Sequence, residues 1–166
     1  MKLNNIVYTF SEFEGKMASL RSEKHFDYLV TIIGEDFGEE GLGCIYIMEN
    51  TDTHERISVK TIAEKKGDSD VVWSVVKLWK GAEILEREVY DFYGIKFLGH
   101  PDMRRIFLRQ DFQCFPFRKD YKPAEGYSLV DDEESDYTTQ YSLNRDGELV
   151  EKKVKLFKDE DFVVNI

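Results

Sequence analysis

Cysteine is scarce in this sequence, with only Cys44 and Cys114 among 166 residues. Neither belongs to a CxxC pair or a Cys-rich spacing, which excludes a cysteine-ligated iron–sulfur motif and a disulfide framework. This usage is typical of a reducing compartment. Long apolar runs are also missing, since no stretch approaches the ~20 apolar residues of a membrane span and no signal-peptide pattern opens the chain. We therefore expect a soluble or peripherally docked protein.

Excess positive charge is missing as well. The formal net charge is −10, and no contiguous basic stripe is present, which argues against general affinity for nucleic acid. A hydrophobic content of 42% excludes disorder of the whole chain. The length suits one domain, and we predict that domain at residues 1–123, followed by an acidic C-terminal extension at 124–166.

The charges that are present are unevenly placed. Residues 124–166 hold 12 acidic and 5 basic side chains, whereas residues 100–122 hold 6 basic and 3 acidic ones. The sequence therefore predicts two regions of opposite charge.

In the first half of the chain, apolar periodicity predicts one helix and three strands. Ser11-Glu12-Phe13-Glu14 reads as a capping box, which predicts a helix up to about Ser22. Alternating β-branched and aromatic residues, separated by a glycine-rich acidic turn, predict a hairpin. The predicted strands are 26–33 and 44–48, which form the hairpin, and 56–62, whose second face is polar.

The second half contains the strongest helix signal. We predict a polar loop at 65–70, and at 71–79 we favour a short helix over a strand. Residues 82–93 predict a helix that Gly94 ends, with Leu85, Val89 and Phe92 along its apolar face. On its charged face Arg87 is spaced to bridge Glu83 and Asp91. Residues 95–98 are apolar, and a turn at 99–102 follows.

The C-terminal extension has weaker patterning. Residues 130–137 form an acidic run, and residues 144–147 predict a turn between strands at 137–143 and 149–157. We expect either an extended arm or a late hairpin.

Several residues could carry chemistry, but each has a plainer interpretation. Glu88 and Asp91 share a helix face at the spacing of carboxylate metal sites, without a helical histidine. His100 beside Asp102 could act as a general base, yet no nucleophile or oxyanion pattern accompanies it. Cys114 has no activating histidine nearby, and the glycines at 41–43 lack a dinucleotide fingerprint. We favour structural or partner-facing roles over an independent enzyme.

Charged and aromatic residues concentrate between Glu86 and Tyr121. Arginine and aromatic side chains lead protein interfaces. The pair Arg104-Arg105 and the run Arg118-Lys119-Asp120 offer guanidinium forks that nearby acids could orient toward a partner. We therefore interpret this segment as a partner-binding surface.

The same residues resemble a known family, the Nqo5-like peripheral-arm C subunit of NADH–quinone oxidoreductase, respiratory complex I. The likeness covers about 26–121. Its departures are Ile84 in place of an aromatic, Cys114 in place of glycine and Phe115 in place of histidine. The residues that match the family pattern are Trp79, Ala82, Glu86-Arg87-Glu88, Tyr90-Asp91, Tyr93-Gly94-Ile95, Phe97, Gly99-His100-Pro101-Asp102, Arg104-Arg105-Ile106, Pro116 and Arg118-Lys119-Asp120-Tyr121.

The resemblance implies an α+β fold, a two-layer sandwich with a mixed or antiparallel sheet packed by helices. It implies a chain without catalytic residues, cofactor or metal, which docks onto two neighbours, the quinone-site D subunit and the iron–sulfur B subunit. Iron–sulfur clusters, and FMN if NADH is the donor, would lie in other subunits. The complex would pass electrons to quinone with coupled ion pumping.

The resemblance also sets the expected location and site. The chain would be peripheral on the cytoplasmic face of a bacterial inner membrane, or on the matrix side in an organelle, and it would be the separate form rather than the form fused to the quinone-site subunit. An equivalent scaffold subunit of a membrane-bound hydrogenase-type complex is the alternative. The residues expected at the partner interface are Glu86, Arg87, Glu88, Asp91, His100, Asp102, Arg104, Arg105, Arg118, Lys119 and Asp120.

Overall fold

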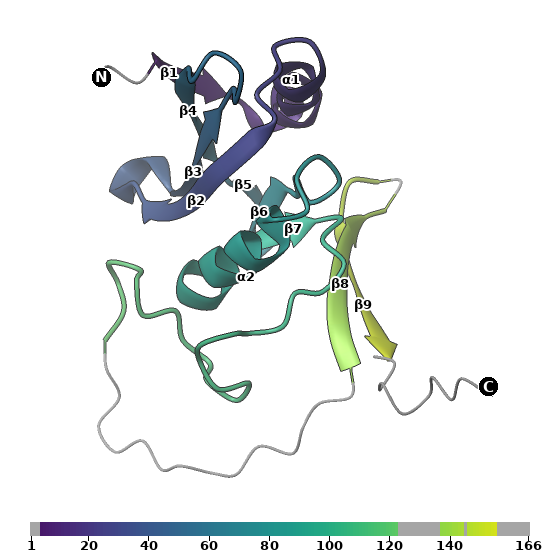
Figure 1. Cartoon of the computed structure of the whole chain (residues 1–166). Coiled ribbons are helices and arrows are strands. Elements are labelled where there is room, and N and C mark those ends of the chain that lie inside the picture. The colour runs from purple at the N-terminus through teal and green to yellow at the C-terminus, as the bar shows by residue number, and fades with distance from the viewer. Residues whose placement is uncertain (1–3, 123–136, 145, 156–166) are drawn as a thin grey trace, which may run out of the picture.

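The computed structural model of the chain describes residues 4–122, 137–144 and 146–155. Figure 1 shows two helices packed among three groups of strands, which confirms the predicted α+β class. In chain order the elements are β1 (Asn4–Tyr8), α1 (Phe10–Ser22), β2 (Tyr28–Asp36), a 3-10 turn (Gly38–Glu40), β3 (Leu42–Glu49), β4 (Arg56–Ile62), β5 (Glu64–Lys66), β6 (Ser69–Trp73), α2 (Ala82–Tyr93), β7 (Lys96–Leu98), β8 (Tyr137–Leu143) and β9 (Leu149–Lys155).

The larger sheet has four strands in the order β1-β4-β3-β2. β2 and β3 form the predicted antiparallel hairpin, with Ile32 opposite Tyr46, and β3 pairs antiparallel with β4. β1 pairs with β4 in parallel, so the sheet is mixed. β2 and β1 are its two edges, and α2 packs against β2 (Figure 1).

The smaller sheet has the order β5-β6-β7. β5 and β6 form an antiparallel hairpin, whereas β6 and β7 are parallel. Parallel neighbours require a crossover connection, which α2 supplies. The crossover places α2 between an edge of the larger sheet and an edge of the smaller one. The segment that follows β7 can therefore reach the C-terminal end of α2.

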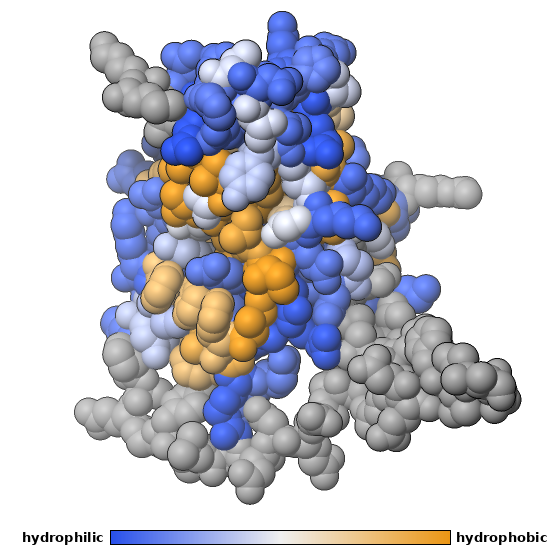
Figure 2. Space-filling model, viewed as in Figure 1, coloured by the Kyte–Doolittle hydropathy of each residue, from blue (hydrophilic) through white to orange (hydrophobic). Residues whose placement is uncertain are grey.

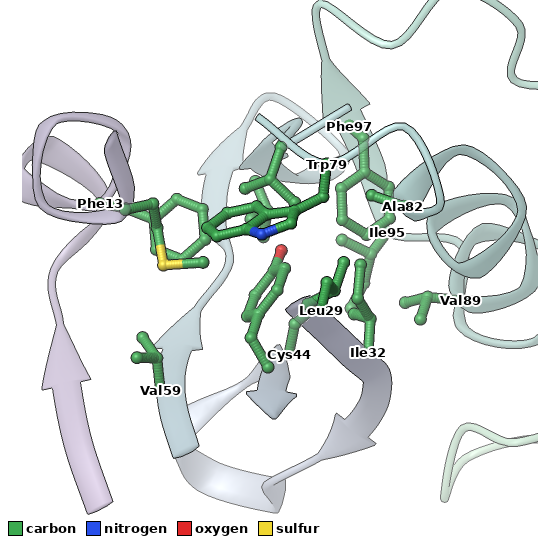
Figure 3. Packing of buried hydrophobic residues seen from close by; sticks show 14 of the residues in the cluster. Phe13, Leu29, Ile32, Cys44, Val59, Trp79, Ala82, Val89, Ile95 and Phe97 are labelled. Atoms are coloured by element: carbon green, nitrogen blue, oxygen red, sulfur yellow. The ribbon is translucent and has the colours of Figure 1, made fainter. Parts of the chain in front are cut away.

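One hydrophobic core joins both sheets and both helices. Figure 3 shows Phe13 of α1, Val59 of β4, Trp79, Val89 of α2 and Phe97 of β7 as parts of one cluster. All five side chains are at most 5% exposed. Burying a large apolar side chain contributes about 1.5–3 kcal/mol, so this cluster fixes the position of α2.

The predicted capping box of α1 is wrong by two residues. The helix begins at Phe10 with Thr9 as N-cap. The Thr9 hydroxyl donates to Glu12 Oε2 at 2.7 Å, and the Glu12 backbone N–H donates to the Thr9 carbonyl at 3.1 Å. Thr9 and Glu12 have the same spacing as the predicted Ser11 and Glu14, so sequence alone did not separate the two caps.

The predictions for 65–70 and 71–79 are also wrong. Residues 64–66 and 69–73 form the β5–β6 hairpin, turned at Gly67 with φ 59°. Asp70 is only 2% exposed, and its charge is paired, because Lys65 Nζ donates to its Oδ2 at 2.8 Å. Val71 is buried as a strand residue, and residues 75–79 form turns rather than a helix. The paired aspartate explains why a polar stretch lies inside a sheet.

Other predictions for the second half are confirmed. α2 has the predicted bounds, and Gly94 adopts φ 73° at its C-terminal cap. Within the extension, β8 and β9 form the late hairpin, and Lys96 Nζ donates to Glu151 Oε1 at 2.7 Å. Residues 130–136 of the acidic run and 156–157 of the last predicted strand lie outside the described residues. The boundary at 123 stays a prediction.

Candidate partner interface

A segment without helix or strand, residues 99–122, crosses the C-terminal end of α2; we call it the strap. Figure 1 shows it running below α2. It contains all the arginines that the sequence assigned to a partner except Arg87. What these arginines contact therefore decides what the segment does.

Asp91 of α2 anchors the strap. Its Oδ2 accepts hydrogen bonds from the backbone N–H groups of Ile106, Phe107 and Leu108 at 3.0, 2.6 and 3.0 Å. Its Oδ1 lies 2.9 Å from Arg105 Nη1. Burial alone would raise the pKa of Asp91, but these amide and guanidinium donors together lower it. The carboxylate therefore fixes the path of the strap.

The strap also supplies donors to the carbonyl groups that end α2. Such carbonyls have no partner within their own helix. The Asp91 carbonyl accepts from Arg105 Nη1 at 2.8 Å and the Tyr93 carbonyl from Arg118 Nε at 2.6 Å. The Phe92 carbonyl accepts from the Phe117 backbone N–H at 3.2 Å. Guanidinium groups at a helix C-terminus also complement the helix dipole.

Arg87 does not bridge Glu83 and Asp91 as predicted. It points to the strap instead, where its Nε and Nη2 donate to the carbonyls of Arg104 and Arg105 at 3.0 and 3.3 Å. The reason is that backbone carbonyls of the strap lie over this face of α2, and a half-buried guanidinium satisfies them.

Arg104 and Asp102 form a local ion pair. Arg104 Nη2 lies 2.8 Å from Asp102 Oδ2, and Arg104 Nε donates to both carboxylate oxygens at 2.9 and 3.0 Å. The Asp102 hydrogen bonds raise the pKa of Arg104. The Arg104 side chain remains 35% exposed, so it is available to a neighbour in part.

His100 is 1% exposed. Its Nδ1 accepts from the Asp102 backbone N–H at 2.9 Å, which leaves Nε2 to donate to the Glu83 carbonyl at 3.0 Å. Burial lowers the pKa of this imidazole. Both ring nitrogens are therefore engaged in shaping the turn at Pro101.

Glu86 is a buried acid in the core of the domain, 0% exposed. Its Oε1 accepts from the Val75 backbone N–H at 2.7 Å, which orders the connection between β6 and α2. Burial raises the pKa of Glu86 to about 8, and the hydrogen bonds from Val75 and Ser74 oppose that rise only in part.

Arg118 also faces inward, because besides the Tyr93 carbonyl it lies over the Phe115 ring at 4.7 Å. Lys119 and Asp120 are exposed, although the Lys119 backbone N–H donates to Asp36 Oδ2 at 2.9 Å. Glu88 is exposed on α2. Of the predicted interface residues, Glu88, Lys119 and Asp120 are exposed, whereas Glu86, Asp91, His100 and Arg105 are enclosed by the chain itself.

Two phenylalanines of the strap, Phe107 and Phe117, point outward, although the sequence interpretation named neither of them. Phe92 stacks between Phe107 and Phe117, with ring centroids at 5.6 and 4.3 Å. Phe107 is 62% and Phe117 55% exposed. The sequence signal that could have indicated these exposed rings is the number of phenylalanines in a segment that lacks strand or helix periodicity.

Within residues 4–122, 137–144 and 146–155, no group of three or more metal-ligating side chains occurs. Glu88 and Asp91 do not converge, because Asp91 turns to the strap. Cys44 is buried and Cys114 exposed, and both are free thiols. No helix in this part of the chain is long and apolar enough to cross a bilayer.

The fold and geometry define an α+β domain in which charged residues brace the strap while Phe107 and Phe117 face outward, a surface of the kind that docks against proteins. The chain belongs to the family described as respiratory-chain NADH dehydrogenase, 30 Kd subunit, whose model matches residues 9–127. The family resemblance noted from the sequence is confirmed.

Relatives are found both fused and separate. The chain is 45% identical over 152 residues to the C/D subunit of the NADH-quinone oxidoreductase of Phocaeicola vulgatus, covering 91% of this chain and 29% of that protein. It is 43% identical over 103 residues to the C subunit of the NADH-quinone oxidoreductase of Chloroherpeton thalassium, covering 61% of this chain and 42% of that protein. The chain thus spans less than half the length of these relatives.

Two solved structures share the fold. A trypsin-resistant fragment (1–134) of Nqo5 aligns with TM-score 0.54 at 28% identity, covering 59% of this chain and 80% of the fragment. A chain of an archaeal membrane-bound sulfane sulfur reductase aligns with TM-score 0.65 at 21% identity, covering 81% of this chain and 85% of that one. The second likeness concerns the fold alone.

Proposed function

We propose that the chain is a non-catalytic peripheral-arm subunit of a proton- or ion-translocating NADH–quinone oxidoreductase. It docks the quinone-site subunit and the iron–sulfur subunit while other subunits carry electrons to quinone. The observation that carries this proposal is the match over 91% of the chain to relatives named as C/D subunits. In these relatives a single polypeptide joins the C and D subunits and so keeps the two in the same complex.

The side chains of the strap support a structural role. Asp91, Arg105 and His100 all form hydrogen bonds within the domain, which supports a structural role for these three side chains. On this proposal the chain has no cofactor of its own, and iron–sulfur clusters and FMN belong to neighbouring subunits. The complex would hold the chain at the cytoplasmic face of the inner membrane.

A second candidate is the equivalent scaffold subunit of another membrane-bound complex, of the hydrogenase type. The fold shared with the archaeal respiratory membrane complex favours keeping it. The two candidates differ in the neighbour, because a hydrogenase-type partner carries nickel-binding cysteines and the quinone-site subunit does not.

Purification of the tagged chain from its own organism under mild detergent tests the proposal. We expect the quinone-site and iron–sulfur subunits to co-purify, identified by mass spectrometry, together with NADH:quinone reductase activity. A partner with nickel-binding cysteines would favour the second candidate. Recovery of the chain alone, or an activity of the isolated chain, would contradict both.

A further inference from the structure

The apolar surface beside the strap has a position and a charge that specify a partner. We propose that the groove between β2 and α2, with the phenylalanine stack at its end, receives the quinone-site subunit, and that this subunit places a basic side chain against Glu88 there. This inference rests on the proposed function, since it names the surface that the proposed partner uses.

The groove has a volume of ≈ 210 Å³. Its walls are residues 31–34 of β2 and residues 88, 89, 92 and 93 of α2, and Phe117 of the strap lies at its end. Four consecutive residues of a strand line it, so the strand backbone as well as its side chains borders the groove. β2 is an edge of the larger sheet, and unpaired strand edges readily accept an extended segment of another protein.

The phenylalanine stack continues the apolar surface. Phe107 and Phe117 are 62% and 55% exposed, and Ile33 of the groove wall is 43% exposed. Figure 2 shows hydrophobic residues gathered over β2, α2 and the region below them on one side of the molecule. A contiguous apolar surface of this kind marks a docking site, and rigid aromatic anchors supply much of the affinity at interfaces.

Glu88 gives the site its charge. It is exposed at the wall of the groove, and within the described ranges it has no hydrogen bond or ion pair. A partner that covers the groove removes this carboxylate from water, which is costly unless a cation pairs with it. The charge therefore specifies an occupant with apolar side chains and one Lys or Arg.

The quinone-site subunit is the occupant that the relatives favour. In the fused C/D proteins this chain's counterpart takes 29% of the polypeptide, so the D portion is tethered beside it. A tether raises the effective concentration of the neighbour to the millimolar range. Arg105 and Arg118 of the strap are turned inward, and the groove and the stack offer an apolar surface for that contact.

Binding of the separately expressed quinone-site subunit of the same organism to the chain of residues 1–166 tests the inference. We expect the double variant Phe107→Ser, Phe117→Ser to raise the Kd roughly thirtyfold or more, the size of a lost hot spot. Glu88→Lys should raise the Kd roughly tenfold, and Glu88→Gln by less, because only the former adds a like charge to the partner's cation.

Val7→Ser is the matched control. Val7 is 67% exposed and lies on β1, at the opposite edge of the sheet from β2. It should change the Kd less than twofold. Thermal unfolding of each free variant checks the fold. Should the double variant unfold, the single variants Glu88→Lys and Phe107→Ser keep the test valid, because the Glu88 and Phe107 side chains both point to solvent.

The outcomes separate the two proposals. If the wild-type chain binds the quinone-site subunit and the folded groove variants bind it equally well, the surface assignment is overturned while the proposed function stands. If the groove variants instead lose binding to the iron–sulfur subunit, or lose the ability to self-associate, the assignment to the quinone-site subunit is overturned. If the wild-type chain does not bind the quinone-site subunit, the proposed function itself fails.

Discussion

Arg105 and Asp91 form the ion pair that joins the strap to α2, with Arg105 Nη1 2.9 Å from Asp91 Oδ1 and a further bond from Arg105 Nη2 to the Cys114 carbonyl at 3.1 Å. The Asp91 side chain is fully buried and that of Arg105 is 7% exposed. A buried pair of this kind contributes little compared with a well-packed apolar pair, but removing one partner leaves an uncompensated charge.

Asp91→Ala should therefore destabilise the chain by about 3–5 kcal/mol, measured by urea unfolding at pH 7. It removes the acceptor of three strap amides as well as the charge partner of Arg105. The double variant Asp91→Ala, Arg105→Met should lose less than the sum of the single variants, because the second change removes the unpaired cation. Additive losses would show that the two side chains do not act as a pair.

Glu88→Ala is the control on the same helix, and its exposed side chain should change stability by no more than about 0.5 kcal/mol.

The pKa of Asp91 is lowered in the folded chain. Its contribution is therefore present above the pKa of an unfolded aspartate, about 3.9, and is lost as the pH falls through the lower folded value.

The raised pKa of Glu86 predicts that stability depends on pH with the opposite sign to the contribution of Asp91. Burial raises its pKa to about 8, above the value of about 4.3 for an unfolded glutamate. The folded chain therefore holds a proton that the unfolded chain releases, and stability falls as the pH rises between these values. The slope is on the order of 1.4 kcal/mol per pH unit from this group.

Glu86→Gln should remove that slope. The variant should match the wild-type chain near pH 4 and exceed its melting temperature near pH 8, because a neutral amide needs no proton when buried. Thermal unfolding at both pH values measures the difference, with Glu88→Gln as an exposed control that leaves the slope unchanged. A wild-type slope that persists in Glu86→Gln would assign it to another group.

Gly34 allows β2 and α2 to pack closely. A Cβ at this position would lie 2.6 Å from Tyr93 Cδ2 and 2.9 Å from Val89 Cγ1. Gly34→Ala should therefore destabilise the chain by about 1–3 kcal/mol, the usual cost of overpacking. The control is Gly81→Ala, where no atom lies within 4 Å of the added Cβ. Equal melting temperatures for both variants would contradict the close packing.

The sequence predicted those elements whose apolar residues recur regularly. α2 and β4 have the predicted bounds because apolar residues recur at helical spacing in α2 and at alternate positions in β4, although Glu86, Asp91 and Ser58 are buried as well. The β5–β6 hairpin was missed because Asp70 is polar and yet buried by its bond to Lys65. Propensity rules assign such a residue to a loop, and its cross-strand pairing with Lys65 in the hairpin overrides them.

The partner-binding site stays a prediction, but the orientation of several of its residues differs from the predicted one. Charges on α2 were interpreted as surface groups, although Glu86 and Asp91 are fully buried. An irregular segment has many backbone N–H groups that need acceptors, and Asp91 provides one for three of them. The sequence predicted aromatic residues at the surface of this segment but did not single out Phe107, because phenylalanine is most often buried and the path of the strap turns this one outward.

Arg118 and Arg104 offer a direct test of which arginines brace the domain. Arg118 donates to the Tyr93 carbonyl and lies over the Phe115 ring, two contacts that need a planar guanidinium, whereas Arg104 pairs with Asp102 two residues away and is 35% exposed. Arg118→Lys should cost about 1 kcal/mol of stability, the size of a typical hydrogen bond, and should speed hydrogen exchange at the strap amides of 115–121. Arg104→Lys should change stability by no more than about 0.5 kcal/mol, as exposed ion pairs do. The reverse order in urea unfolding would mean that Arg104, and not Arg118, holds the strap on α2.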